Sequence, residues 1–156
     1  MGFKSDAEIL HIYQSLIDQS LPKPDWTHAA HFAAACAMIA DPARNAERDM
    51  PDIIESYNLS TGVENTDHDG YHHTITLASL GAARHYGKKD ISLFERVNTV
   101  MTSECGQSDW LLAYWSKEAL FSPIARHEWV VPDLKTLPFP VRLSCCLLYT
   151  SDAADE

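Results

Sequence analysis

Three histidines of the 156-residue chain have the residue type and spacing of metal ligands. His28 and His31 lie three positions apart in a segment that is predicted to be helical, so both imidazoles fall on one helix face. His72 begins a second predicted helix and could supply a third nitrogen ligand. Three neutral imidazoles that leave one coordination position open are typical of a catalytic transition-metal site. The pattern therefore predicts a divalent zinc, nickel, iron or manganese ion bound by His28, His31 and His72.

Other polar residues near these histidines could move a proton or bind a substrate. His73 follows His72, and Glu64 lies in the polar segment 60–70 just before it, so either could act as a general base toward metal-bound water. Arg126 could bind a substrate carboxylate or phosphate through its guanidinium group. These three candidate catalytic residues indicate a metal-dependent hydrolase or transferase.

Other interpretations of the same residues stay open, and whether the chain is an enzyme is undecided. The histidines could line a polar pocket that binds a small molecule without chemistry. The alanine-rich segment 28–40 could instead pack on a partner protein, or on a second copy of the chain in a homodimer. Purely structural roles also remain: His28, His31 and His72 as helix-end residues, and Arg126 as a fastening for the C-terminal segment.

The charge and hydropathy of the chain narrow the classes of partner. The formal net charge is −10, and an acidic surface repels nucleic-acid phosphates. No apolar run approaches the roughly 20 residues that are needed to cross a bilayer, and residues 1–8 lack the apolar core of a signal peptide. We therefore expect a cytoplasmic protein with a small-molecule substrate or ligand, and neither nucleic acid nor a membrane as partner.

The last thirteen residues differ from the rest of the chain. Residues 144–156 resemble the translated sequencing-adapter read-through that ends many metagenomic reading frames. We expect a single helical domain over residues 1–143, followed by a non-native tail over residues 144–156. The tail contains three acidic residues and no basic ones, so the net charge of −10 becomes −7 without it. The acidic character therefore does not depend on the tail.

The spacing of apolar residues predicts the elements that must position the candidate residues. Helical periodicity and N-cap residues such as Ser5 and Thr27 indicate helices, and Pro51 is expected to begin one of them. No segment shows the period-2 alternation of a strand. The predicted fold class is all-α, a compact bundle-like array of about six helices with no sheet. The main predicted helices span residues 5–20, 28–40, 52–59, 71–86, 92–102 and 124–130.

Taken together, several short motifs resemble a known type of protein. The patterns are WTHxxH at residues 26–31, GYHxTIT at residues 70–76 and LFSPxAR at residues 120–126. In combination they resemble a family of small, uncharacterised bacterial all-helical proteins, with similarity over about residues 5–140. Members often have Glu at the position of His73, so the chemistry of this chain could differ. The resemblance implies a helical fold and a role for His28, His31 and His72, and it implies no substrate.

Overall fold

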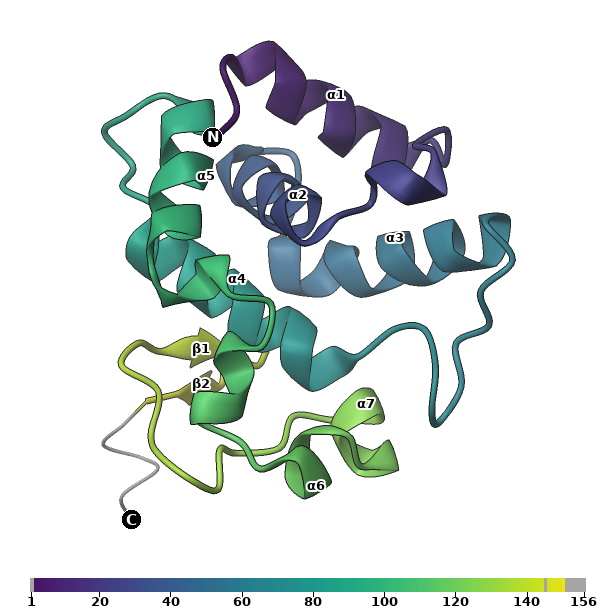
Figure 1. Cartoon of the computed structure of the whole chain (residues 1–156), viewed down its shortest axis with the longest axis vertical. Coiled ribbons are helices and arrows are strands. Elements are labelled where there is room, and N and C mark those ends of the chain that lie inside the picture. The colour runs from purple at the N-terminus through teal and green to yellow at the C-terminus, as the bar shows by residue number, and fades with distance from the viewer. Residues whose placement is uncertain (1, 145, 151–156) are drawn as a thin grey trace.

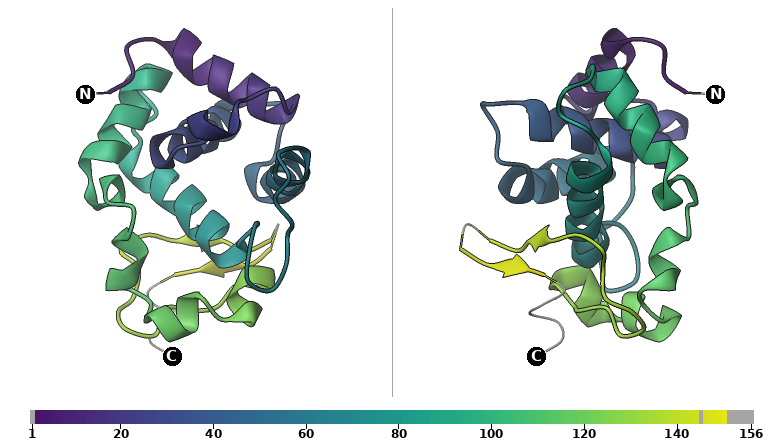
Figure 2. Two further views of the ribbon diagram at one scale, coloured as in Figure 1. Left: turned by 45° about the vertical axis from the view of Figure 1, so that its right-hand side comes forward. Right: turned by 90° about the vertical axis from the view of Figure 1, so that its left-hand side faces the viewer.

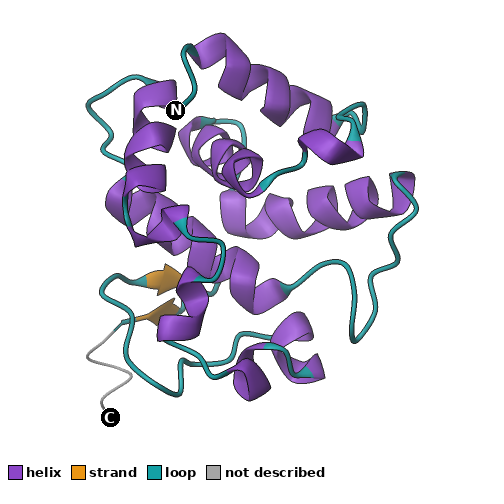
Figure 3. Ribbon diagram, viewed as in Figure 1, coloured by secondary structure: helices purple, strands orange, loops and turns teal. Residues whose placement is uncertain are grey.

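A computed structural model describes residues 2–144 and 146–150 of the protein. The other positions of the predicted tail, 145 and 151–156, lie outside the described residues. Helices make up most of the described chain (Figure 1, Figure 3). The α-helices are α1 (Asp6–Ile17), α2 (His28–Ala40), α3 (Ala46–Ser60), α4 (His73–Tyr86), α5 (Leu93–Thr102), α6 (Lys117–Leu120) and α7 (Pro123–His127). The 3-10 helices are η1 (Lys23–Asp25), η2 (Glu104–Gly106) and η3 (Trp110–Ala113), and the strands are β1 (Val141–Arg142) and β2 (Leu148–Tyr149).

The prediction of a mainly helical protein is confirmed, and the prediction that there is no sheet is wrong. Strands β1 and β2 pair antiparallel, with Val141 opposite Tyr149 and Arg142 opposite Leu148. Two residues are too few to show the alternation by which a strand is recognised in a sequence. Tyr149 is 3% exposed, and its hydroxyl accepts a hydrogen bond from the Leu137 backbone N–H at 3.3 Å. Tyr149 is therefore buried against the segment between α7 and β1, where its ring also lies beside Trp129, whereas Leu148 is exposed.

Side-chain caps set the starts of the longer helices. The hydroxyl of Ser5 accepts from the Glu8 N–H at 3.3 Å, and that of Thr27 accepts from the Ala30 N–H at 3.1 Å, as the sequence predicts. The expected start at Pro51 is wrong, because α3 begins at Ala46 after its N-cap Asn45. Pro51 lies in the second turn of this 15-residue helix, where its missing N–H removes a single backbone hydrogen bond.

Helix α2 is the centre of the hydrophobic core. Helices α1, α3, α4 and α5 all pack against it, as Figure 2 shows from two further directions. Ala33 and Ala34 are fully buried, and such small side chains let neighbouring helices approach closely. Among the described residues, no helix is both long enough and apolar enough to cross a membrane.

Helices α6 and α7 lie at the end of the molecule opposite α1, beside the start of α4 (Figure 1). Side chains fasten them there by hydrogen bonds to backbone atoms. The Thr74 hydroxyl donates to the Glu128 carbonyl at 2.8 Å and accepts from the Val130 N–H at 3.2 Å. Arg126 donates to the carbonyls of Gly70 at 3.1 Å and Tyr71 at 3.5 Å. The start of α4 is therefore held by the segment that follows α6.

Candidate functional site

His28 links the start of α2 to the 3-10 helix η2. The ring is half-buried, and its Nε2–H donates to the Cys105 carbonyl at 2.7 Å. The ring also packs edge-on against Phe32 of the same helix, with 5.4 Å between centroids. This hydrogen bond joins two segments that are 77 positions apart in the sequence, so the His28 side chain has a clear structural role.

The side chain of His31 forms its hydrogen bond within the first turn of α2. Its Nδ1–H donates to the Thr27 carbonyl at 2.7 Å, and its ring stacks on Trp26 with 3.7 Å between centroids. Surrounding protein atoms lower the pKa of His31 although the residue is exposed. The nearby His28 lowers that pKa further, so these two histidines lie within electrostatic reach of each other, as their spacing predicts.

His72 is the N-cap of α4, and it is 8% exposed. Its Nδ1 accepts from the Ile75 N–H at 3.2 Å, and its Nε2–H donates to the Leu120 carbonyl at 2.6 Å. Both ring nitrogens are therefore bonded to backbone atoms, which requires the neutral ring with its proton on Nε2. Burial lowers the pKa of His72 to about 4, and Arg126 contributes to this shift.

The three predicted metal ligands thus bond to three different backbone carbonyls. His28 and His31 influence each other electrostatically, whereas the histidine that acts on the pKa of His72 is its neighbour His73. Within residues 2–144 and 146–150, no group of three or more His, Cys, Asp or Glu residues is arranged to hold a metal ion. Metal binding by these histidines stays a prediction.

The candidate catalytic residues lie around the start of α4 but do not converge on one point. The Nδ1 of His73 is hydrogen-bonded to the Tyr71 hydroxyl at 2.8 Å, and burial lowers the pKa of His73. Arg126 binds backbone carbonyls, which is the fastening role that the sequence left open. Glu64 is exposed in the loop between α3 and α4.

That loop is held in one shape by an asparagine. The Asn65 Oδ1 accepts from the Tyr71 N–H at 2.9 Å and from the Asn58 side chain at 3.0 Å, while its Nδ2 donates to the Glu55 carbonyl at 3.1 Å. Gly70 completes the turn with a φ of +81°, and a Cβ there would meet the Glu64 carbonyl oxygen at 2.4 Å. The length of this loop is thus explained by a local hydrogen-bonded structure.

The most distinctive group of charged residues lies elsewhere, around a cavity of about 330 Å³ at the C-terminal end of α2. We call it the basic cavity. Four of the twelve lysines and arginines of the chain line it, although the protein as a whole has a net charge of −10. The lining residues are Ile39, Ala40, Arg84, Lys89, Arg96 and Arg142.

A single carboxylate compensates part of this positive charge. Glu47 of α3 accepts hydrogen bonds from both terminal nitrogens of Arg84, one of them at 2.8 Å, and the two side chains are 10% and 19% exposed. Among the described residues, Lys89, Arg96 and Arg142 form no ion pair. Three of the four cations of the basic cavity therefore have no acidic partner among the described residues.

Arg96 is fixed against the wall of the basic cavity. Its Nη2 donates to the Lys89 carbonyl at 3.3 Å, and its Nε–H is buried without an acceptor in the described part of the chain. A buried donor that lacks an acceptor costs about 1–3 kcal/mol, so such groups call for an explanation. The guanidinium of Arg96 is thus held in place with unused hydrogen-bonding capacity.

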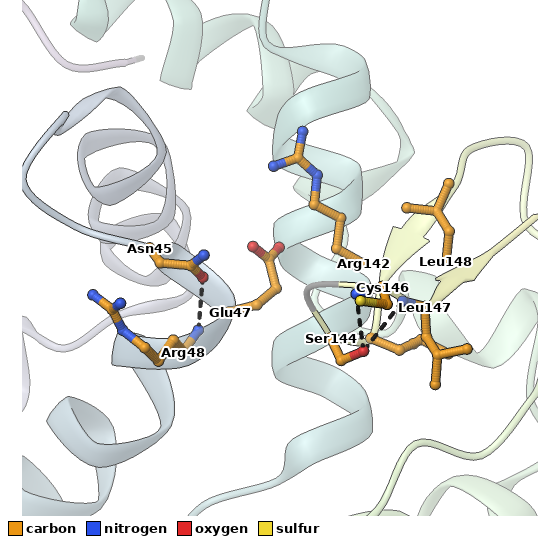
Figure 4. A pocket seen from close by; sticks show the side chains of 9 residues that line it. Asn45, Glu47, Arg48, Arg142, Ser144, Cys146, Leu147 and Leu148 are labelled. Atoms are coloured by element: carbon orange, nitrogen blue, oxygen red, sulfur yellow. Dashed lines mark hydrogen bonds between the residues drawn. The ribbon is translucent and has the colours of Figure 1, made fainter.

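A second cavity, of about 710 Å³, adjoins the first through Arg142, which lines both. Figure 4 shows it between the start of α3, with Asn45, Glu47 and Arg48, and the hairpin of β1 and β2. Its other wall includes Leu147 and Leu148, which belong to the segment predicted to be a non-native tail. The basic cavity has no lining residue beyond Arg142, so we base the functional argument on it alone.

Sequence reasoning missed the basic cavity because its cations come from separate places in the chain. Arg84 lies in the last turn of α4, Lys89 follows that helix, Arg96 belongs to α5 and Arg142 to β1. No local motif connects them. The available signal was the scarcity of basic residues in an acidic protein, which does not reveal that some of them lie together.

Comparisons with known proteins give no relative for this chain. A scan against protein-family models, a search of curated proteins and a search of solved structures each found no match. The resemblance to small bacterial helical proteins therefore stays a prediction, and the functional argument depends on the geometry of the chain itself.

Proposed function

We propose that the protein is a small-molecule-binding domain whose ligand is an anion held in the basic cavity. The observation that carries this proposal is the convergence of Arg84, Lys89, Arg96 and Arg142 on one cavity. Like charges repel, so gathering four cations is unfavourable unless something compensates them. An anionic ligand supplies that compensation, and arginine is well suited to bind carboxylates and phosphates.

Helix ends alone do not account for the group of cations. The C-terminus of a helix carries roughly half a negative charge, and this attracts basic side chains. Arg84 lies in the last turn of α4, and α2 ends at Ala40 beside the cavity. Two helix ends together offset about one positive charge, and Glu47 offsets another. About two positive charges remain for a ligand.

The basic cavity supports binding better than the histidines support catalysis. Its volume of about 330 Å³ falls at the lower end of the range for small-molecule sites. The imidazoles of His28 and His72, by contrast, hold distant backbone segments together, and that of His31 bonds within its own helical turn. A non-catalytic binding role is one of the alternatives that the sequence leaves open. The sequence placed the ligand beside the histidines, whereas we propose that it lies in the basic cavity.

Isothermal titration calorimetry with a panel of anions tests this proposal. The matched variants are Lys89→Gln, which changes a lysine of the basic cavity, and Lys88→Gln, which changes an exposed neighbour outside the lining. We expect at least one multivalent anion to bind. Lys89→Gln should weaken its affinity about fivefold, since one exposed charge pair contributes up to about 1 kcal/mol, and Lys88→Gln should leave it unchanged. Absence of binding by every anion, or equal weakening in both variants, would contradict the proposal.

A further inference from the structure

The charge of the basic cavity limits the charge of its ligand. Arg84, Lys89, Arg96 and Arg142 contribute four positive charges. Glu47 cancels one, and the ends of α2 and α4 cancel about one more, so about two positive charges remain. A singly charged anion would leave the site positive, whereas a dianion would neutralise it.

The donors of the basic cavity favour an oxyanion with several oxygens in different directions. Arg96 comes from α5, Lys89 from the segment after α4 and Arg142 from β1, so they approach from three parts of the fold. A planar carboxylate offers two oxygens to one arginine, whereas a phosphate group offers three strong acceptor oxygens, which can bond to several arginines at once. Arg84 is already paired with Glu47, which leaves the other three side chains for the ligand.

The remaining walls indicate a small ligand. Ile39 and Ala40 are the apolar lining residues, so the cavity offers little surface to a large apolar group. Its volume of about 330 Å³ suits a phosphate group with a short polar body. From the charge, the donors and the size, we infer that the ligand carries a dianionic phosphate group, as inorganic phosphate or as a small phosphate ester. This inference rests on the proposed function.

Ligand titration can be separated from protein titration. The ionisable side chains that line the basic cavity are its four cations, of which Arg84 is paired with Glu47, while Arg96 acts on the pKa of the buried Cys36 thiol. Burial raises the pKa of Cys36 to about 12, and no histidine is among the lining residues. A phosphate ester loses its second proton near pH 6. A rise in affinity between pH 5.5 and 7.5 would therefore come from the ligand.

The test is calorimetry of the full chain with inorganic phosphate, glycerol phosphate, sulfate and citrate at pH 5.5 and 7.5. Only about a quarter of a phosphate ester is dianionic at pH 5.5 and nearly all of it at pH 7.5, so its affinity should rise about fourfold. Sulfate keeps its charge, so its affinity should stay constant. Binding of only one of the two phosphates would identify the source of the group and support the inference.

The outcomes separate this inference from the function on which it rests. Binding of citrate without either phosphate would overturn the phosphate assignment and leave an anion-binding domain. Phosphate binding with no pH dependence would overturn the dianionic form. Absence of binding by all four anions would overturn both proposals. Arg142→Gln is a second variant beside Lys89→Gln, because this exposed side chain can be changed with little risk to folding. If Arg142→Gln left the affinity for phosphate unchanged, the inference would also be overturned.

Discussion

His72 should make the stability of the protein depend on pH in a way that one substitution removes. Its ring is neutral in the folded protein, because Nδ1 accepts from the Ile75 N–H and Nε2–H donates to the Leu120 carbonyl. Burial lowers its pKa from the ordinary value of 6.5 to about 4. Between these two pH values the unfolded chain binds more protons than the folded one, so stability falls as the pH falls.

The size of this effect follows from the two pKa values. The contribution is fully present above pH 6.5, decreases as the pH falls and is lost below about pH 4. Each pKa unit corresponds to about 1.4 kcal/mol, which gives at most about 3 kcal/mol in total. At pH 5 the folded protein should have lost about 2 kcal/mol relative to pH 7.5 through His72 alone.

The comparison variant is His72→Asn, whose side chain can still cap the helix but does not titrate in this range. Its free energy of unfolding at pH 7.5 should be lower than that of the unchanged protein by about 1–3 kcal/mol, because the Leu120 carbonyl loses its donor. Urea unfolding at pH 7.5 and pH 5 measures both proteins. At pH 5 the free-energy gap between them should shift by about 2 kcal/mol in favour of the variant, because only the unchanged protein titrates at position 72 in this range. A gap that does not change with pH would refute the role assigned to His72.

Three further predictions concern the cavity, the loop and the metal. Glu47→Gln removes the carboxylate paired with Arg84, so anion affinity measured by calorimetry should rise about fivefold while stability in urea falls. If affinity and stability both rose or both fell, the idea that Glu47 competes with the anion for the positive charge of the cavity would be contradicted. Asn65→Ala removes three hydrogen bonds from the loop and should lower stability by about 1–3 kcal/mol and speed proteolysis between α3 and α4; unchanged cleavage would show that other contacts hold the loop. Elemental analysis after incubation with zinc, nickel, iron and manganese should find the same low metal content in the protein and in a His28→Ala, His72→Ala double variant. Near-stoichiometric metal that the double variant loses would instead restore the metal-dependent hypothesis.

The sequence predicted most of the helices because their signals are local. The Ser5 and Thr27 caps and the apolar spacing after them fall within one or two turns, and the structure contains the predicted hydrogen bonds. The strand pair could not be predicted, since each strand has only two residues and the partner of Val141 lies in a segment set aside as a tail. Pro51 misled the prediction because its effect depends on its depth in the helix.

The candidate site was harder to predict because it depends on contacts between distant segments. Histidines spaced for metal binding were noticed, yet the atoms that bond to His28 and His72 are carbonyls 77 and 48 positions away. A carbonyl can belong to any residue type, so no sequence pattern marks it. The basic cavity has the same difficulty, because Arg84 and Arg142 meet only through the fold.

A nuclear magnetic resonance titration tests most directly whether the basic cavity binds an anion. Amide resonances of the ¹⁵N-labelled protein would be followed while inorganic phosphate is added at pH 7.5, with sodium chloride of equal ionic strength as the control. The predicted result is a saturable shift of the Ile39, Ala40 and Lys89 amides that chloride does not reproduce. Shifts confined to residues around His28 and His31, or none beyond the chloride control, would contradict the assignment of the cavity as the ligand site.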